Sequence, residues 1–245
     1  MVTASAGACV IIRGRMKFAE DIRAAVRIGL ASVRANLVPM VALWLVAGLL
    51  VGAYYSFAGI AAAFEPIAEW HRQRDLVAVS VNRLVFCGLL PGVFLVLKHK
   101  GSWTRVLRTV FAQSVFAVGC GILCNWMYSW NAWLLGEGMD LVTVTVKTIV
   151  CQFIWTPLVF VPIGSVVYFW VGCDLSLVRL RKEWPDDFLC ECYLPNLLTN
   201  WIIWIPVAMA IHMFPTALQI QLSGLASAFL SLAFITLGRM IGRGR

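Results

Sequence analysis

Lys147-Thr-Ile-Val-Cys151-Gln152-Phe-Ile-Trp-Thr-Pro157 begins the part of the chain that decides the fold. From Thr148 to Cys173, 26 residues follow one another without a charged side chain, which suits one helical crossing of a membrane. A second uncharged run, from Cys192 to Gly238, lasts 47 residues. As a single helix it would be roughly 70 Å long, whereas the hydrocarbon core of a bilayer is about 30 Å thick. The chain therefore has to cross, turn and cross back.

Proline residues indicate where the helices bend or end. Pro215, in Met213-Phe-Pro-Thr216, is predicted to break the second run, and Pro206 to kink its first half. Proline lacks the N–H that continues a helix, and its ring collides with the preceding turn. Two crossings joined near Pro215 are therefore expected.

The composition places the chain in the membrane class. Hydrophobic residues make up 61% of the 245 residues and charged residues 13%, with a mean hydropathy of +0.84, whereas soluble domains carry about 25% charged residues. Backbone groups inside a bilayer must pair within helices or a closed barrel, and long apolar runs without alternation favour helices. We predict an all-α, polytopic transmembrane helix bundle with about six spans, or five if one C-terminal segment is re-entrant.

The chain divides into four predicted segments. Residues 1–36 form a basic targeting and amphipathic segment, residues 37–75 an additional transmembrane helix (Leu37–Phe64) and a polar hairpin, residues 76–238 the main bundle, and residues 239–245 a basic tail. The start of the chain is rich in Arg, Ala and Ser and poor in acids, a bias typical of mitochondrial targeting segments. No secretory signal is predicted.

Residues 16–36 are predicted to form an amphipathic helix at the membrane interface. The expected apolar face consists of Phe18, Ile22, Val26, Gly29 and Val33. Basic residues gather opposite, and Arg23, Arg27 and Arg34 are expected to contact anionic, cardiolipin-like lipids. A docking helix for a partner protein is the alternative, and the sequence does not separate the two.

Tryptophans gather at the end of the predicted span Thr109–Gly136. Trp126, Trp130 and Trp133 are expected to form a belt at the headgroup level, in contact with lipids or a partner. Arg83 lies near the start of another predicted span, Leu76–Leu97. Its alternatives are an ion pair with an acid and extension toward the interface, and we expect the second.

Residue patterns of catalytic and ligand sites are not found. The eight cysteines lie mostly in predicted spans, where cysteine behaves as a small hydrophobe, and the three histidines are scattered. No zinc spacing, nucleophile–base pair or phosphate loop is present. We therefore expect no catalytic residues, no bound metal and no cofactor.

Lys and Arg residues are most frequent in every second segment that connects the predicted spans. The N-terminal segment has six Lys and Arg residues, the loop Lys98–Arg108 four, the loop after Cys173 three and the tail three, while the turns at Glu137 and Pro215 have none. This alternation is an orientation signal rather than a nucleic-acid surface. Both termini are expected on the positive side, which is the matrix if the membrane is mitochondrial.

Lys147-x3-Cys151-Gln152-x4-Pro157 resembles the pattern Lys-x3-Asp-Gln-x4-Pro in the third helix of the Mpv-seventeen/peroxisomal-membrane-protein-twenty-two family. Further matches follow in the family's order: Asn125-Trp126-x-Tyr128, Leu180-Arg-Lys-Glu-Trp184-Pro185, Asn200-Trp201-Ile-Ile-Trp204, Pro215 and Phe229-Leu230-Ser231. The resemblance covers roughly residues 76–237 and rests on the order of these short motifs.

The resemblance implies a small helical protein of the inner mitochondrial membrane or, alternatively, the peroxisomal membrane. Members of the family are proposed to form channels or to support mitochondrial homeostasis, without catalytic activity. This chain departs from the pattern because Cys151 replaces an intramembrane acid and Gln219 an arginine. The span Leu37–Phe64 is additional.

Two functions follow from these observations. The first is a structural or accessory subunit of a larger membrane complex, such as a respiratory-chain complex, in contact with other membrane-protein subunits. The second is a small-solute channel, as the resemblance implies. An aqueous path needs polar lining, and the neutral candidates are Gln152, Asn125, Asn131, Asn200 and His212. We expect these five to form interhelical hydrogen bonds instead.

Overall fold

The structure of the chain is a computed structural model that describes residues 20–34, 36–97 and 103–242. These residues are almost entirely helical, with no strand among them. The predicted all-α bundle is therefore confirmed. Within the described part of the chain, five helices are long and apolar enough to span a membrane; they are Leu37–Ser56, Asp75–Phe94, Val106–Leu135, Leu141–Gly172 and Leu189–His212.

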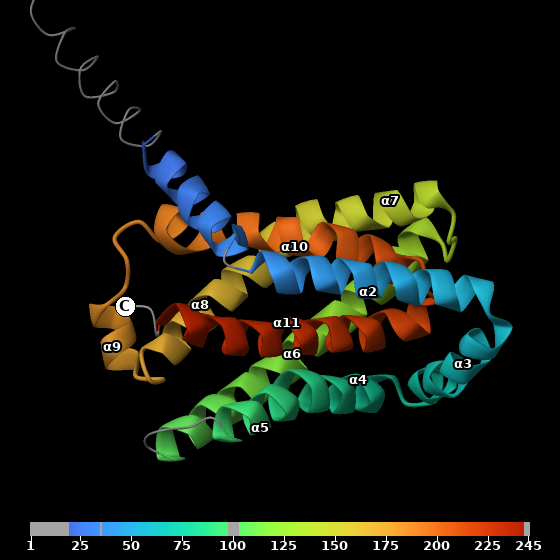
Figure 1. Cartoon of the computed structure of the whole chain (residues 1–245), viewed down its shortest axis with the longest axis horizontal. Helices are drawn as coiled ribbons and strands as arrows, with labels where there is room; N and C mark the ends of the chain where they lie inside the picture. Colours follow the sequence, from blue (N-terminus) through green and yellow to red (C-terminus); the bar gives the residue numbers. More distant parts are fainter. Residues whose placement is uncertain (1–19, 35, 98–102, 243–245) are drawn as a thin grey trace, which may run out of the picture.

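Six helical passes alternate in direction along the bundle (Figure 1). They are α2 (Leu37–Ser56), α4 to α5 (Asp75–Arg83 and Leu90–Leu97), α6 (Trp103–Leu135), α7 to α8 (Leu141–Val150 and Val161–Gly172), α10 (Leu194–His212) and α11 (Thr216–Gly242). The sixth pass, α11, is apolar over Thr216–Leu230. The helix over residues 20–34 and the end of α11 lie at the same end of the bundle.

The additional span is shorter than the sequence predicted. The expected helix Leu37–Phe64 is interrupted at Phe57, whose backbone is extended, and a separate helix α3 (Ala58–Gln73) follows. The predicted polar hairpin is therefore wrong, because its residues are helical as far as Gln73. Tyr54 packs edge-on against both Phe64 and Phe214. These aromatic contacts hold the chain where it turns back at the end of α2.

Three wide π-helical turns interrupt the α-helices, and each lies at or just before a proline. They are η1 (Leu84–Leu89) before Pro91, η2 (Cys151–Phe160) around Pro157 and η3 (Leu189–Tyr193) before Pro195. A π turn shifts the hydrogen-bond register by one residue, so the helix continues past a residue that has no N–H to donate. Pro215 instead lies in the break between α10 and α11, as predicted.

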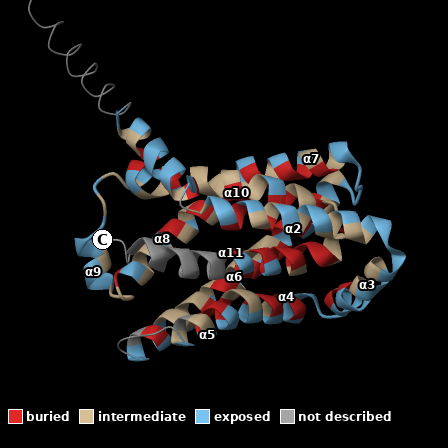
Figure 2. Cartoon of the chain, in the orientation of Figure 1, coloured by how far each residue is buried: buried red, intermediate tan, exposed pale blue. Residues whose placement is uncertain are grey.

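Helix α11 occupies the centre of the bundle. It contacts α2, α3, α4, η1, α5, α6 and α10, and Figure 2 shows its described side chains to be largely buried. Leu218 and Ile220 of α11 are completely buried among Met40 of α2, Met127 of α6 and Val207 of α10. The core therefore consists of side chains of α2, α6 and α10 that pack around α11.

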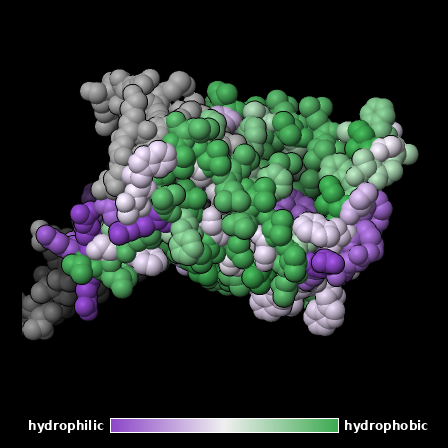
Figure 3. Space-filling model, turned by 90° about the horizontal axis from the view of Figure 1, so that it is seen from below, coloured by the Kyte–Doolittle hydropathy of each residue, from purple (hydrophilic) through white to green (hydrophobic). Residues whose placement is uncertain are grey.

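The outer surface is apolar between two polar ends. Figure 3 shows a broad hydrophobic area along one side of the bundle, with hydrophilic residues gathered toward both ends. Large hydrophobic side chains are exposed on every candidate span, including Leu49, Leu89, Phe111, Leu158 and Leu189. Exposure of this extent suits lipid rather than water as the surrounding medium.

The helix over residues 20–34 packs against the start of α10. Ala25, Gly29 and Val33 are buried, and Thr199 donates to the Gly29 carbonyl at 3.4 Å. Part of the predicted amphipathic helix is thus present, while residues 16–19 and 35 lie outside the described residues. Val26, on the predicted apolar face, is exposed and does not occupy the side of the helix that packs against α10. Ala25 takes that place because it keeps the helical spacing of four to Gly29.

Candidate functional site

A row of polar side chains runs along α11 inside the bundle. Gln219, Ser223 and Ser227 recur every four residues and therefore lie on one face of the helix. Together with Arg83, Tyr128, Lys147 and His212 they form a set of polar side chains that we call the polar seam. The seam contains two cationic side chains, Arg83 and Lys147. Neither forms an ion pair with any carboxylate of the described chain.

Arg83 lies at the end of α4 and points into the bundle. Only 6% of it is exposed, so the prediction that it extends toward the interface is wrong. Its guanidinium donates to Ser223 Oγ at 2.6 Å and to Ser227 Oγ at 3.4 Å. Both hydroxyls donate their own protons back to carbonyls of α11, which leaves their lone pairs directed at the arginine.

Two glycines make room for this arrangement. A Cβ atom at Gly121 of α6 would collide with the Arg83 side chain, and one at Gly224 of α11 would collide with Asn82. Asn82 donates to the Gln221 carbonyl at 3.3 Å. The helices α4, α6 and α11 can therefore approach one another closely only because both positions lack a side chain.

Lys147 and His212 form the other end of the polar seam. Lys147, on α7, is 2% exposed and His212, at the end of α10, is 1% exposed. They lie within electrostatic reach of each other, and the His212 ring packs edge-on against Tyr128 with 5.5 Å between centroids. Within the described residues, the ring nitrogens of His212 and the amide of buried Asn131 on α6 have no partner at ordinary hydrogen-bond geometry, although the Gln219 side chain is close enough to interact with the His212 ring. Such orphaned buried groups mark a functional or strained position.

Two carboxylates lie just before the N-terminus of α7. Glu137 and Asp140 act on Lys147 through space, but both are exposed. Hydrogen bonds from Thr143 hold the pKa of Asp140 below its ordinary value, so this carboxylate is ionised at neutral pH. Negative charge therefore lies on the surface at the start of α7, and the cationic Lys147 lies buried behind it.

A second polar cluster joins α3, α4, α6 and α11. The His71 ring contacts Gln221 at 3.4 Å and the Asp75 carboxylate at 3.3 Å, and Asn125 donates to the same carboxylate at 2.8 Å. Burial lowers the pKa of His71, and the Asp75 charge opposes that shift. The expected interhelical hydrogen bond of Asn125 is present.

Three of the motif residues meet at η2. Trp201 of α10 donates its indole N–H to the Gln152 carbonyl at 2.6 Å. In a π-helix this carbonyl would pair with the N–H of residue 157, but residue 157 is proline and has none. Trp201 supplies the missing donor, and Tyr193 donates to the Pro157 carbonyl at 2.9 Å. The spacing Gln152-x4-Pro157 and the distant tryptophan thus belong to one backbone requirement.

The other predicted site residues lie outside this contact. Asn200 and Trp204 are half-buried on α10, and Trp204 packs against the core. Trp184 is exposed near Pro185 and stacks on Phe188, with centroids 4.8 Å apart. This pair lies between α9 (Leu177–Lys182) and η3. The structure therefore gives Trp184 and Pro185 a place in a loop, separate from the polar seam.

The predicted contact residues are exposed to different extents. Arg23, Arg27 and Arg34 are exposed on the helix over residues 20–34. Trp126 and Trp130 pack edge-on against Trp155, with centroids 5.3 and 5.8 Å apart, whereas Trp133 is 79% exposed. Trp126 and Trp130 therefore join α6 to η2, and Trp126, which is also exposed, presents part of its ring to the surroundings as Trp133 does.

Comparisons with protein-family models, with curated proteins and with solved structures find no match to this chain. The resemblance to the Mpv-seventeen/peroxisomal-membrane-protein-twenty-two family therefore rests on the sequence motifs alone.

The hydroxyls that hold Arg83 are expected to stabilise the bundle. Replacing Ser223 by Ala removes an acceptor from a buried cation, which should lower the free energy of unfolding by about 1.5–3 kcal/mol. Ser129→Ala is the matched control, because Ser129 is exposed on α6. Unfolding of both variants in detergent micelles measures the difference, and equal stability of the two would contradict the assignment.

The bond between Trp201 and Gln152 is expected to depend on Pro157. Trp201→Phe leaves a carbonyl without its donor, at a cost of about 1–3 kcal/mol. In a Pro157→Ala background the new N–H serves that carbonyl, so Trp201→Phe should cost less. A double-mutant cycle of unfolding free energies measures this coupling. The same cost in both backgrounds would show that Trp201 acts by packing alone.

Proposed function

We propose that the chain is a non-enzymatic integral protein of the inner mitochondrial membrane and serves as an accessory subunit of a larger membrane complex. The observation that carries this proposal is the outward face of α2. Gly48, Gly52 and Ser56 are exposed at a spacing of four. A Cβ atom at either glycine would meet nothing within 4 Å. Of the five candidate spans, α2 is the least buried.

The outward face of α2 suits contact with a transmembrane helix of another protein. Small residues every four positions let two helix backbones approach closely, and association in lipid depends on such packing because burial of apolar surface drives nothing there. Leu45 and Leu49 flank the stripe and are exposed. They would close over the sides of a partner helix.

The location and orientation are part of the same proposal. The bias of the N-terminal segment toward Arg, Ala and Ser supports a mitochondrial membrane. Loops rich in Lys and Arg belong to the end of the bundle where the helix over residues 20–34 and the end of α11 lie. In an inner mitochondrial membrane the side that carries the positive loops is the matrix, so both termini would face the matrix.

Descent from the Mpv-seventeen/peroxisomal-membrane-protein-twenty-two family is also a proposal. The joint use of Gln152, Pro157 and Trp201 in one contact supports it, because motif residues that meet in space are more informative than their spacing alone. The break at Pro215 supports it as well. The extra helix α2 would then be the feature that adapts an older bundle to assembly.

Native electrophoresis of gently solubilised membranes is expected to find the chain in a large assembly. The double variant Gly48→Leu/Gly52→Leu should shift it to a small species, because the added side chains keep a partner helix from approaching. Gly119→Leu is the matched control. Gly119 is exposed on α6, and its Cβ would likewise meet nothing.

Two results would overturn the accessory role. The first is migration of the unaltered chain only as a monomer or small homo-oligomer. The second is dissociation by Gly119→Leu as readily as by the α2 variant, since general damage would then account for the loss.

The polar seam favours a second candidate, a channel for small anionic solutes. Arg83 and Lys147 carry positive charge into the interior without a carboxylate partner in the described chain. Charged groups inside the membrane commonly mark an ion path. His212, whose ring nitrogens lack partners at ordinary hydrogen-bond geometry within the described residues, lies within electrostatic reach of Lys147. A path along α11 would use these groups in turn.

Conductance in planar bilayers tests this candidate. The purified chain should pass anions in preference to cations, and Lys147→Met should lower that preference because it removes a buried positive charge. Lys182→Met, which alters an exposed lysine of α9, should leave it unchanged. Bilayers that stay silent with well-folded protein would eliminate the channel.

A further inference from the structure

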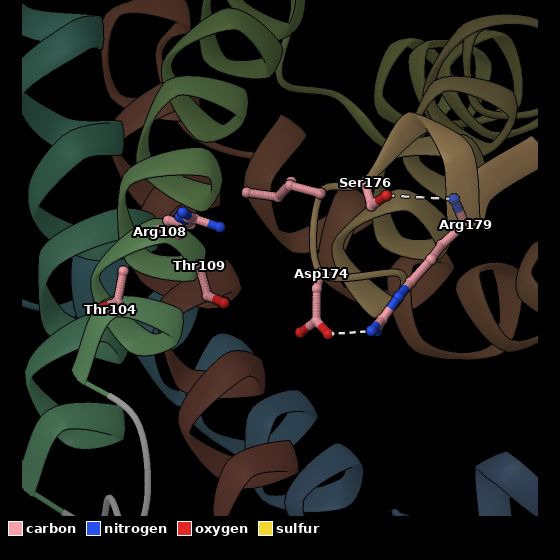
Figure 4. Close-up of a pocket in the computed structure, with 7 residues that line it drawn as sticks. Thr104, Arg108, Thr109, Asp174, Ser176 and Arg179 are labelled. Atoms are coloured by element: carbon pink, nitrogen blue, oxygen red, sulfur yellow. Dashed lines mark hydrogen bonds and ion pairs between the residues drawn. The ribbon is translucent and has the colours of Figure 1, made fainter.

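A polar cavity of about 430 Å³ opens at the end of the bundle that holds α9. Its lining residues are Thr104, Arg108, Thr109, Asp174, Leu175, Ser176 and Arg179. Figure 4 shows Thr104, Arg108 and Thr109 of α6 facing a second wall. That wall consists of Asp174 and Ser176, in the turn between α8 and α9, and Arg179 of α9. The volume lies in the range of small-ligand sites, roughly 300–1,000 Å³.

The charges of this cavity suit an anion. Two arginines, Arg108 and Arg179, are among the described lining residues of the cavity. Arg179 pairs with Asp174 at 2.7 Å, and this pair offsets the Arg179 charge. Among the residues that the structure describes, no hydrogen bond or ion pair of Arg108 is found, so its guanidinium contributes a positive charge and N–H donors that are available to a ligand. Guanidinium groups bind phosphate oxygens with short, charge-assisted hydrogen bonds. The hydroxyls of Thr104 and Ser176 lie among the same lining residues.

One wall of the cavity has a fixed backbone. Asp174 and Leu175 both adopt left-handed conformations, with φ of 55° and 60°. Bonds from Leu175 N to Trp170 O and from Ser176 N to Cys173 O, at 3.0 and 3.1 Å, close the turn. Ser176 then caps α9 by accepting from Arg179 N at 3.3 Å. A strained turn held by several bonds presents its side chains in a fixed arrangement.

Exposed apolar side chains follow the lining residues closely in sequence on both helices. Leu107 and Phe111 of α6 and Leu177 and Val178 of α9 are exposed. The cavity also lies where two candidate spans end, since Val106 begins one and Gly172 ends another. A polar recess between apolar surfaces at this level matches a lipid, with a charged headgroup and hydrocarbon chains.

We propose that this cavity binds a phosphate group, supplied by the headgroup of an anionic phospholipid with a single negative charge. The phosphate accepts hydrogen bonds from Arg108 and lies beside the Arg179 guanidinium, and the acyl chains lie along Leu107 and Phe111. This site is separate from the outward face of α2 and from the polar seam. Its test can therefore fail without affecting the accessory role, and the reverse also holds.

Native mass spectrometry of the full chain, titrated with phosphatidylglycerol in detergent, tests the proposal. Arg108→Gln should weaken binding about tenfold, because one charge-assisted contact is lost. Asp174→Asn should strengthen binding, since it removes the one carboxylate found among the described lining residues, and asparagine tolerates the left-handed conformation. A gain of affinity of this kind cannot come from a folding defect.

Arg181→Gln is the matched control, because Arg181 is exposed on the same helix α9 and does not line the cavity. It should bind phosphatidylglycerol as the unaltered chain does. Equal loss in Arg108→Gln and Arg181→Gln would overturn the site in favour of general charge attraction. Inorganic phosphate alone should bind more weakly than the lipid, and equal or tighter binding would overturn the lipid as its source.

Discussion

The need to satisfy polar groups where no water is present is the constraint on which this structure depends. Moving a charged side chain to the middle of a membrane helix costs about 2.5–3.5 kcal/mol, while a hydrogen bond to a charged group contributes about 1.5–3 kcal/mol. Two hydroxyl acceptors on α11 are therefore enough to offset most of the cost of burying Arg83. They are effective because Ser223 and Ser227 already donate to their own helix. The last helix of the chain must then lie beside α4, and its central position in the bundle follows.

The same constraint explains the wide turns. A proline in an α-helix leaves one carbonyl without a donor, and inside a bilayer no water can replace it. In η2 the shift to a π turn places that deficit at the Gln152 carbonyl, where the Trp201 indole reaches it. A residue of α10 thereby completes the backbone of the preceding pass. The two bonded residues are 49 apart in the sequence. A proline in one helix therefore determines which residue of the neighbouring helix must contact it.

Runs of uncharged residues were sufficient to predict the helical bundle and the break at Pro215, because hydropathy and proline act locally. The end of the first span was not predicted. No charge or proline marks Phe57, and the turn there depends on Tyr54 meeting Phe214 from the far end of the chain. The position of Arg83 was missed for a similar reason. The hydroxyl acceptors that favour the interior over the interface, Ser223 and Ser227, lie 140 and 144 residues away from it in the sequence. The spacing of four between Gln219, Ser223 and Ser227 was the signal available in the sequence, and it acquires meaning only beside a buried cation.

The distribution of polar groups also separates two kinds of contact with the surroundings. Inside the bundle, cations are enclosed by hydroxyls and aromatic rings and cannot reach a partner protein. On the outside, α2 presents its backbone rather than charged side chains, because Gly48 and Gly52 have no side chain and no other atom lies within 4 Å of where their Cβ atoms would be. Helices associate in lipid through such close packing, so specificity for a partner helix must come from shape. A bundle whose polar groups are satisfied internally can add a helix of this kind at its edge without disturbing its core. The few contacts of α2, which involve α3, α10 and α11, are consistent with that mode of addition. Its Trp44 anchors it by one bond to the Ile203 carbonyl at 3.0 Å, which leaves the opposite face available.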